Sequence, residues 1–267
     1  MAYDATGGGP AVVLMHAGVG DRRLWDGQVE ALAERHLVVR PDLRGYGESP
    51  LPGGPFSHVE DVRALLDELG VSEASLVGNS FGGRVAIDFA LAYPERVRAL
   101  LLVAPALTGY EGSPMLDALD EKEDELLDAG KFDEAVALNV RTWLDGEGRD
   151  AAPVPPEVRE RLAMMQRRAF ETIVAAYEAP TPPGPVAWSD PPARTCLGEI
   201  TAPTLVVIGA HDLPDFRAIG ELLAEELPGA ESITMDTAHL PSLEAPDELN
   251  RIALDFLRVY AGPDQGG

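Results

Sequence analysis

Short apolar runs rich in β-branched residues recur along the chain, with room for a helix between most of them. Most runs are continuous rather than alternating, as expected for parallel strands covered on both faces. They lie at residues 11–15, 37–40, 74–78, 98–103, 204–208 and 231–235. Segments with helical spacing of apolar residues lie near 24–34, 58–69, 81–92, 215–227 and 242–259. This order predicts an α/β fold with a doubly wound, mostly parallel sheet.

The alternation stops between residues 107 and 198, where the sequence contains no convincing strand. In KFDEAVALNVRTWL and PEVRERLAMMQRRAFETIV, the apolar residues fall on one helical face instead. We therefore predict a helical cap (lid) domain at 107–198, inserted into a core domain made of 1–106 and 199–267. The core sheet is expected to have six to eight strands, and the tail GPDQGG is expected to be disordered.

Composition narrows the classes of function. The 267-residue chain is 45% hydrophobic, enough for a sizeable core, and has a formal net charge of −24. Such an excess of acid argues against nucleic-acid binding and disfavours polyanionic ligands. We therefore expect a small neutral or moderately apolar substrate. The acidic run YEGSPMLDALDEKEDELLDAGKFDE is interpreted as a solvated helix face.

Several familiar signals are missing from the sequence. There is no run of about eighteen apolar residues for a membrane span, and MAYDATGGGP lacks the basic start and apolar stretch of a secretory signal. The single cysteine, Cys196, permits no internal disulfide and no thiolate metal cage. No metal-ligand cluster and no G-x-G-x-x-G turn is evident. We expect a cytoplasmic protein with no membrane partner, metal or cofactor.

The most informative stretch is Gly78-Asn79-Ser80-Phe81-Gly82, a G-x-S-x-G sequence between a predicted strand and the helical RVAIDFALAY. A sharp strand-to-helix turn would hold Ser80 in a strained conformation above the sheet edge, with glycines where a Cβ would clash. The Phe81 N–H, at the helix N-terminus, would point to the same space and stabilise developing negative charge. The alternative is a tight turn with an incidental serine.

A nucleophilic serine needs a base, and histidine is the usual one. His239 follows the last predicted strand and precedes the last helix, at the carboxyl edge where such folds bind ligands. His16, at the end of the first strand, more often braces its loop. His36 and His58 have no supporting context, and His211 is interpreted as a neighbour of the functional Asp212.

The base needs an acid that holds the imidazole ring. Asp212 follows the strand TLVVIG at the same carboxyl edge. Asp215 lies three residues further on, where the role of a helix N-cap suits it better. The resulting order, Ser80, Asp212, His239, is that of α/β-hydrolases.

The sequence resembles the α/β-hydrolase fold superfamily in its capped, small-molecule branch. The matching blocks are VVLMHAGVGDRRLW, RPDLRGYGESP, SLVGNSFGGRVAIDFALAYPERV, PTLVVIGAHDLPDF and AHLPSLEAPDELN. The resemblance implies that Ser80 is the nucleophile, Asp212 the acid and His239 the base. It implies backbone N–H groups of Phe81 and Gly18 as the oxyanion hole, and a structural role for the turn of Asp42 and Arg44.

Two departures from the family pattern affect these expectations. The oxyanion strand ends in His-Ala-Gly instead of His-Gly, which leaves Gly18 without a side chain and is expected to enlarge the acyl pocket. About ten residues precede the first clear strand, which suggests six or seven strands. The cap would offer Phe132, Trp143, Met164, Met165, Phe170 and Trp188 as candidate pocket residues, although packing within the cap suits most of them equally.

The leading hypothesis is a serine hydrolase that cleaves a carboxylic ester, lactone or related acyl compound through an acyl-enzyme. A serine suits acyl transfer, whereas epoxide-opening and dehalogenating relatives carry aspartate at this turn. The same triad could instead serve C–C bond hydrolysis, cofactor-free peroxidation or acyl transfer, because the cap and pocket select the reaction. The third hypothesis is a non-catalytic ligand-binding or sensor protein on the same fold.

Overall fold

The computed structural model describes residues 1–260, so the expectation for the tail GPDQGG lies outside the described residues. The strands are β1 (Tyr3–Gly7), β2 (Ala11–Met15), β3 (Leu37–Pro41), β4 (Gly54–Phe56), β5 (Ala74–Asn79), β6 (Val97–Val103), β7 (Pro183–Val186), β8 (Thr204–Gly209) and β9 (Glu231–Met235). The α-helices are α1 (Asp26–Ala33), α2 (His58–Glu68), α3 (Phe81–Ala92), α4 (Pro114–Asp128), α5 (Phe132–Asn139), α6 (Pro156–Tyr177), α7 (Pro214–Glu226), α8 (Pro241–Glu244) and α9 (Pro246–Tyr260). Short helices, including the π-helix η3 (Val140–Asp145), join some of them.

The main sheet has seven strands in the order β1-β3-β2-β5-β6-β8-β9. All neighbours pair in parallel except β1, which is antiparallel to β3. The predicted α/β fold with a mostly parallel sheet is therefore confirmed, and the strand count falls within the expected range. The first strand, which the sequence pattern did not reveal, is the antiparallel edge strand β1.

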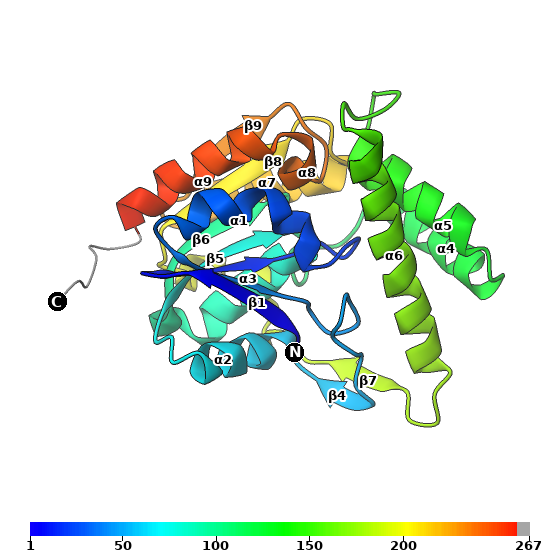
Figure 1. The fold of residues 1–267 in the computed structure, drawn as a ribbon, viewed down its shortest axis with the longest axis horizontal. Coiled ribbons are helices and arrows are strands. Elements are labelled where there is room, and N and C mark those ends of the chain that lie inside the picture. The colour runs from blue at the N-terminus through cyan, green and yellow to red at the C-terminus, as the bar shows by residue number, and fades with distance from the viewer. Residues whose placement is uncertain (261–267) are drawn as a thin grey trace.

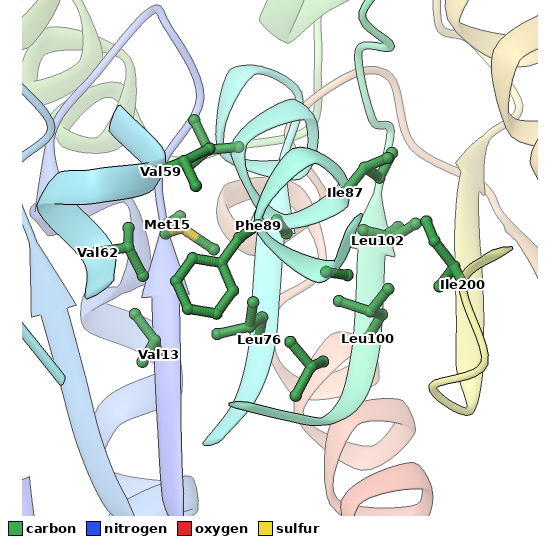
Figure 2. Close-up of a cluster of buried hydrophobic side chains, with 14 of the residues drawn as sticks. Val13, Met15, Val59, Val62, Leu76, Ile87, Phe89, Leu100, Leu102 and Ile200 are labelled. Carbon is green, nitrogen blue, oxygen red and sulfur yellow. The ribbon is translucent and has the colours of Figure 1, made fainter. Parts of the chain in front are cut away.

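Both faces of the sheet are covered, which explains why its strands are continuously apolar. Along β2, Val12 and Leu14 pack toward α1 and α9, whereas Val13 and Met15 pack toward α2, α3 and α7. Figure 2 shows the second of these layers, where Phe89 of α3 extends between α2 and the strands. In sheets covered in this way, ligands bind at the carboxyl ends of the strands.

The helices α4, α5 and α6 form an insertion between the neighbouring strands β6 and β8. In Figure 1 they lie at one end of the sheet, away from the C-terminus. Their apolar faces join a buried cluster with Val19 and Leu24, after β2, and with Leu240 and Leu243, before and within α8. The insertion therefore shares its hydrophobic core with the loops at the carboxyl edge. The domain boundaries at 107 and 198 stay a prediction.

Two expectations about elements were wrong. The interval 107–198 does contain a strand, β7, which pairs in parallel with β4 outside the main sheet (Figure 1). These strands are three and four residues long and contain proline and glycine, so they carry no alternating pattern. The predicted helix 242–259 is two helices, because Pro246 disfavours helical backbone at Ala245, whose φ is −140°.

None of the helices in the part described by the structure combines the length and apolar character needed to cross a membrane.

Candidate active site

Ser80 occupies the sharp turn between β5 and α3. Its backbone has φ 52° and ψ −111°, a strained conformation for a residue with a Cβ. Three hydrogen bonds hold it: Ser80 N–H donates to Val103 O at 3.0 Å, and Ser80 O accepts from Arg84 and Ala106 N–H, each at 3.0 Å. The strain is therefore imposed by the surrounding backbone, as is usual at functional positions.

The glycines flanking Ser80 are required by close backbone approach. A Cβ on Gly82 would lie 2.2 Å from Met15 O, at the end of β2. A Cβ on Gly78 would lie 2.4 Å from Gly82 O, where the helix folds back over the strand. Both distances are far below van der Waals contact, so only glycine fits. This packing lets α3 begin directly after Ser80.

Asp212 and His239 form a buried pair at the ends of the adjacent strands β8 and β9. Asp212 Oδ2 lies 2.8 Å from His239 Nδ1, and both residues are 1% exposed. The other carboxylate oxygen, Oδ1, accepts from Leu213 N–H at 2.7 Å. An ionised carboxylate can only accept hydrogen bonds, so His239 Nδ1 carries the hydrogen of this bond and Nε2 is left as the basic nitrogen.

Aromatic rings and one amide fix the position of His239. Trp143 lies against its ring at a centroid distance of 4.6 Å, and Phe216 meets it edge-on at 4.4 Å. Asn79 Nδ2 donates to His239 O at 3.1 Å and to Val103 O at 2.9 Å. Because Asn79 precedes Ser80, this amide links the serine turn directly to the histidine loop.

Ser80 and His239 line one cavity of about 250 Å³ between the sheet edge and the insertion. Its apolar walls include Trp143, Phe170 and Phe216. The other residues lining it are Gly18, Val19, Tyr46, Phe81, Arg84, Ala106, Asp120, Glu123, Asn139, Gln166, Ala169 and Ile173. Of the candidate cap residues, Trp143 and Phe170 therefore face the cavity, whereas Met165 is buried in the insertion and Met164 is 61% exposed.

Gly18 and Phe81 both line this cavity and lie close together, since a Cβ on Gly18 would lie 3.7 Å from Phe81 Cβ. Gly82 N–H donates to His16 O at 3.1 Å, which holds the loop after β2 against the start of α3. A Cβ on Gly18 would lie 3.4 Å from the Tyr46 hydroxyl. Tyr46 thus limits the extra room expected at Gly18.

Burial, with a contribution from Glu123, raises the pKa of Tyr46 to about 12, so its hydroxyl stays protonated at neutral pH.

The cavity also has an acidic wall that the sequence interpretation missed. Asp120 and Glu123 belong to the acidic run of α4, which was expected to face solvent, yet both line the cavity. Burial raises the pKa of Glu123, and the nearby Asp120 carboxylate adds to the rise, against a hydrogen bond from Asn139 that lowers it. The interpretation as a solvated face is therefore wrong for Glu123, whereas Asp120 is exposed at the mouth of the cavity.

The remaining candidate histidines have structural contacts. His16 is fully buried: its Nε2 accepts from Leu43 N–H at 2.9 Å, and its Nδ1 lies 2.8 Å from Ala17 O. Both of its nitrogens brace the loop, as the sequence analysis expected. His211 Nε2 lies 2.8 Å from Asp236 Oδ1 and its ring does not line the cavity described above.

Asp215 is buried but lies outside the His239 pair. Its carboxylate accepts from Ser113 N–H and Ser113 Oγ, each at 2.7 Å, and so holds the start of α4. The expected N-cap role was wrong, because Leu213 occupies the N-cap position of α7. Asp42 accepts from Arg22 and Glu48 N–H groups at 2.9 and 2.8 Å, which shapes the turn after β3.

The structure adds site residues that sequence reasoning missed. Asn79 stood inside the G-x-S-x-G motif, but its link to the histidine loop spans 160 residues of sequence. Tyr46 lies in the block RPDLRGYGESP, but nothing in that block marked it as a cavity residue. Asn139 and Gln166 belong to helical segments with no motif, so no local signal identified them. Within residues 1–260, no group of three or more His, Cys, Asp or Glu side chains is arranged to hold a metal ion.

A serine in a strained strand-to-helix turn, on a mostly parallel sheet that also carries a His–Asp pair, is the arrangement of α/β hydrolases. The chain belongs to the α/β hydrolase fold family, whose model matches residues 10–246.

Individual relatives differ in how much of their length is matched. The chain shares 39% identity over 107 residues with an uncharacterized protein of Mycobacterium tuberculosis, covering 39% of this chain and only 31% of that protein. It is 31% identical over 266 residues to a 2-hydroxy-6-oxononadienedioate/2-hydroxy-6-oxononatrienedioate hydrolase of Cupriavidus pinatubonensis, covering 95% and 89% of the two chains. A thermophilic esterase from Thermogutta terrifontis has a similar structure, with a TM-score of 0.77, 25% identity and coverage of 98% and 94%.

Proposed function

We propose that this protein is a serine hydrolase that cleaves a small carboxylic ester, lactone or related acyl compound. One observation carries the proposal: strained Ser80 borders the same small cavity as His239, whose ring is held by a 2.8 Å contact with Asp212. The similarity to a hydrolase and to an esterase supports the reaction class.

In the proposed mechanism, Ser80 Oγ attacks the carbonyl carbon while His239 Nε2 takes the serine proton. Asp212 keeps the imidazole in the required tautomer and stabilises the imidazolium that forms. The tetrahedral intermediate collapses, the C–O bond to the leaving group breaks, and His239 returns the proton to that oxygen. Water then attacks the acyl-enzyme, again with His239 as the base, and regenerates Ser80.

The oxyanion of the intermediate would be stabilised by the backbone N–H groups of Gly18 and Phe81. Phe81 is the first residue of α3, where N–H groups have no acceptor within the helix. The partial positive charge at this helix end favours an anion. Loss of a single such donor typically costs roughly 3–4 kcal/mol of transition-state stabilisation.

Cavity size and charge favour a small substrate without carboxylate groups. The volume of about 250 Å³ lies just below the range of about 300–1,000 Å³ that is typical of small-molecule pockets. The relative from C. pinatubonensis is named for a dioate substrate, which makes C–C bond hydrolysis the second candidate function. The carboxylates of Asp120 and Glu123 in the cavity wall would repel a dianion, which favours the ester or lactone reaction.

The direct test measures hydrolysis of a chain-length series of p-nitrophenyl esters by the wild type and by Ser80→Ala. We expect turnover by the wild type, loss of turnover in Ser80→Ala, and a preference for short acyl chains. Ser72→Ala, at an exposed serine away from the cavity, is the matched control and should keep wild-type rates. Equal rates for wild type and Ser80→Ala would overturn the serine mechanism.

A covalent fluorophosphonate label extends the test to the case in which no ester is cleaved. Labelling of the wild type and not of Ser80→Ala would still support an activated serine. Failure to label, together with absence of turnover, would favour a ligand-binding or sensor protein. The division into core and cap domains and the cytoplasmic location remain predictions from the sequence.

A further inference from the structure

Glu123 is held in a fixed position relative to the proposed base. Asn139 Nδ2 donates to Glu123 Oε2 and to Ala135 O, and Asn139 Oδ1 accepts from Trp143 Nε1 at 2.8 Å. The Trp143 ring in turn lies against His239. This chain of contacts fixes the Glu123 carboxylate, which lines the same cavity as Ser80, and it leaves acceptor positions of the carboxylate unused.

A second, independent side chain in the same cavity lacks a partner. Gln166 of α6 is 3% exposed and lines the cavity. Its Oε1 is buried and accepts no hydrogen bond from any residue between 1 and 260. A buried amide oxygen without a donor is costly, and a ligand that brings an N–H group would relieve that cost.

Arg84 is a cationic residue that lines the cavity, and its guanidinium group interacts with other residues. Arg84 donates to Thr108 Oγ1 at 2.9 Å and lies over the Trp188 ring at 3.7 Å. Thr108 donates in turn to Asp88, whose carboxylate attracts Arg84. Glu123, inside the cavity, and Asp120, at its exposed mouth, have no cation of the described chain within ion-pair distance. The part of the cavity wall formed by Asp120 and Glu123 is therefore acidic.

We infer that Glu123, Asp120 and Gln166 form a subsite for a protonated amino group carried by the substrate. A protonated amine would donate an N–H group to one of these three acceptors, and the carboxylates would stabilise its positive charge. This inference rests on the hydrolase function proposed above and specifies its substrate class as a small, amine-bearing ester, thioester or lactone. It departs from the expectation of a small neutral or moderately apolar substrate, which stays a prediction.

The test compares substrates of nearly equal shape that differ in charge. One pair, S-(dimethylaminoethyl) thioacetate and S-isopentyl thioacetate, places the charge in the leaving group. A second pair, S-methyl dimethylaminobutanethioate and S-methyl methylhexanethioate, places it in the acyl group. Thiol release gives kcat/KM for each compound. We expect the cationic member of at least one pair to be favoured about tenfold or more by the wild type.

Two substitutions in α4 test whether the preference for the cationic substrate arises from the subsite. Glu123→Gln should reduce the ratio of cationic to neutral kcat/KM toward one. Glu121→Gln removes the same charge from an exposed position of the same helix that does not line the cavity, so the ratio should stay at its wild-type value. A preference that persists in Glu123→Gln, or that both variants lower equally, would assign it to the general negative charge of the protein.

Calorimetric binding of the same compounds to Ser80→Ala separates this inference from the proposed reaction. Tighter binding of the cationic member, lost when Glu123→Gln is added, supports the subsite even if the wild type cleaves none of the compounds. Equal or weaker binding of the cationic members, or no binding by either pair, overturns the subsite. In that case, Ser80-dependent cleavage of p-nitrophenyl esters would leave the hydrolase function standing.

Discussion

Acidification should destabilise this protein through the buried side chain of His58. His58 is 3% exposed, and its ring meets Phe56 and Phe81 edge-on at centroid distances of 5.1 and 5.0 Å. Burial lowers the pKa of His58 to about 4, against a nearby carboxylate, Asp61, which raises it, while Arg44 and other cations lower it further. At neutral pH the imidazole is therefore uncharged in the folded protein.

The sign and size of the effect follow from the difference in pKa between the two states. An unfolded histidine has a pKa of about 6.5, so between roughly pH 6.5 and pH 4 the unfolded chain binds a proton that the folded chain excludes. Stability is complete above this window and falls as the pH drops through it. The two pKa values differ by about 2.5, and at about 1.36 kcal/mol for each pH unit the free energy of unfolding falls by about 3 kcal/mol by pH 4.

Urea unfolding at pH 7 and pH 4 measures this loss as a change in the free energy of unfolding. His58→Phe keeps an aromatic ring and removes the titrating nitrogens, so it should lose about 3 kcal/mol less than the wild type between the two pH values. Met164→Leu, at an exposed side chain with no titrating group, is the control and should lose as much as the wild type. Equal losses in the wild type and His58→Phe would refute the reasoning.

Two further predictions concern the serine turn and the base. Gly82→Ala places a methyl group 2.2 Å from Met15 O, and should lower the free energy of unfolding by at least about 1–3 kcal/mol. The control is Gly198→Ala, where no atom lies within 4 Å of the new Cβ, and it should change the free energy of unfolding by less than about 0.5 kcal/mol. Similar losses in the two variants would contradict the packing argument. Asp212→Asn should leave the fold intact and reduce kcat on p-nitrophenyl esters by about four orders of magnitude, because the amide favours the wrong tautomer of His239. A variant that keeps the wild-type kcat would show that Asp212 is not the catalytic partner of His239.

Much of the fold could be predicted from the sequence because its signals are local. Each interior strand has to bury both of its faces, so it appears as a continuous apolar run. The serine turn was equally visible, since backbone crowding at Gly78 and Gly82 excludes any side chain there. The positions of Asp212 and His239 followed from a general property of parallel sheets, which bring the carboxyl ends of their strands to one edge.

Other features had no local signal and depended on tertiary contacts. The strands β4 and β7 exist because two segments about 130 residues apart meet beside the main sheet, not because either has strand character. The sequence also could not place Asp215, whose carboxylate bonds to Ser113 of the insertion instead of capping its own helix. In both cases the partner that decided the outcome lies far away in the chain.

The chemistry of the site divides in the same way. The sequence by itself determined which residues are the candidate nucleophile, base and acid, because their residue types and places after strands follow from backbone geometry. Only the tertiary structure decided that Glu123, Asn139 and Gln166 face the cavity, because the docking of α4, α5 and α6 selects which helix faces surround it. An acidic helix has the same sequence pattern whether a carboxylate points to bulk water or into a pocket. The fold of the insertion, and not its composition, therefore sets the charge of the cavity.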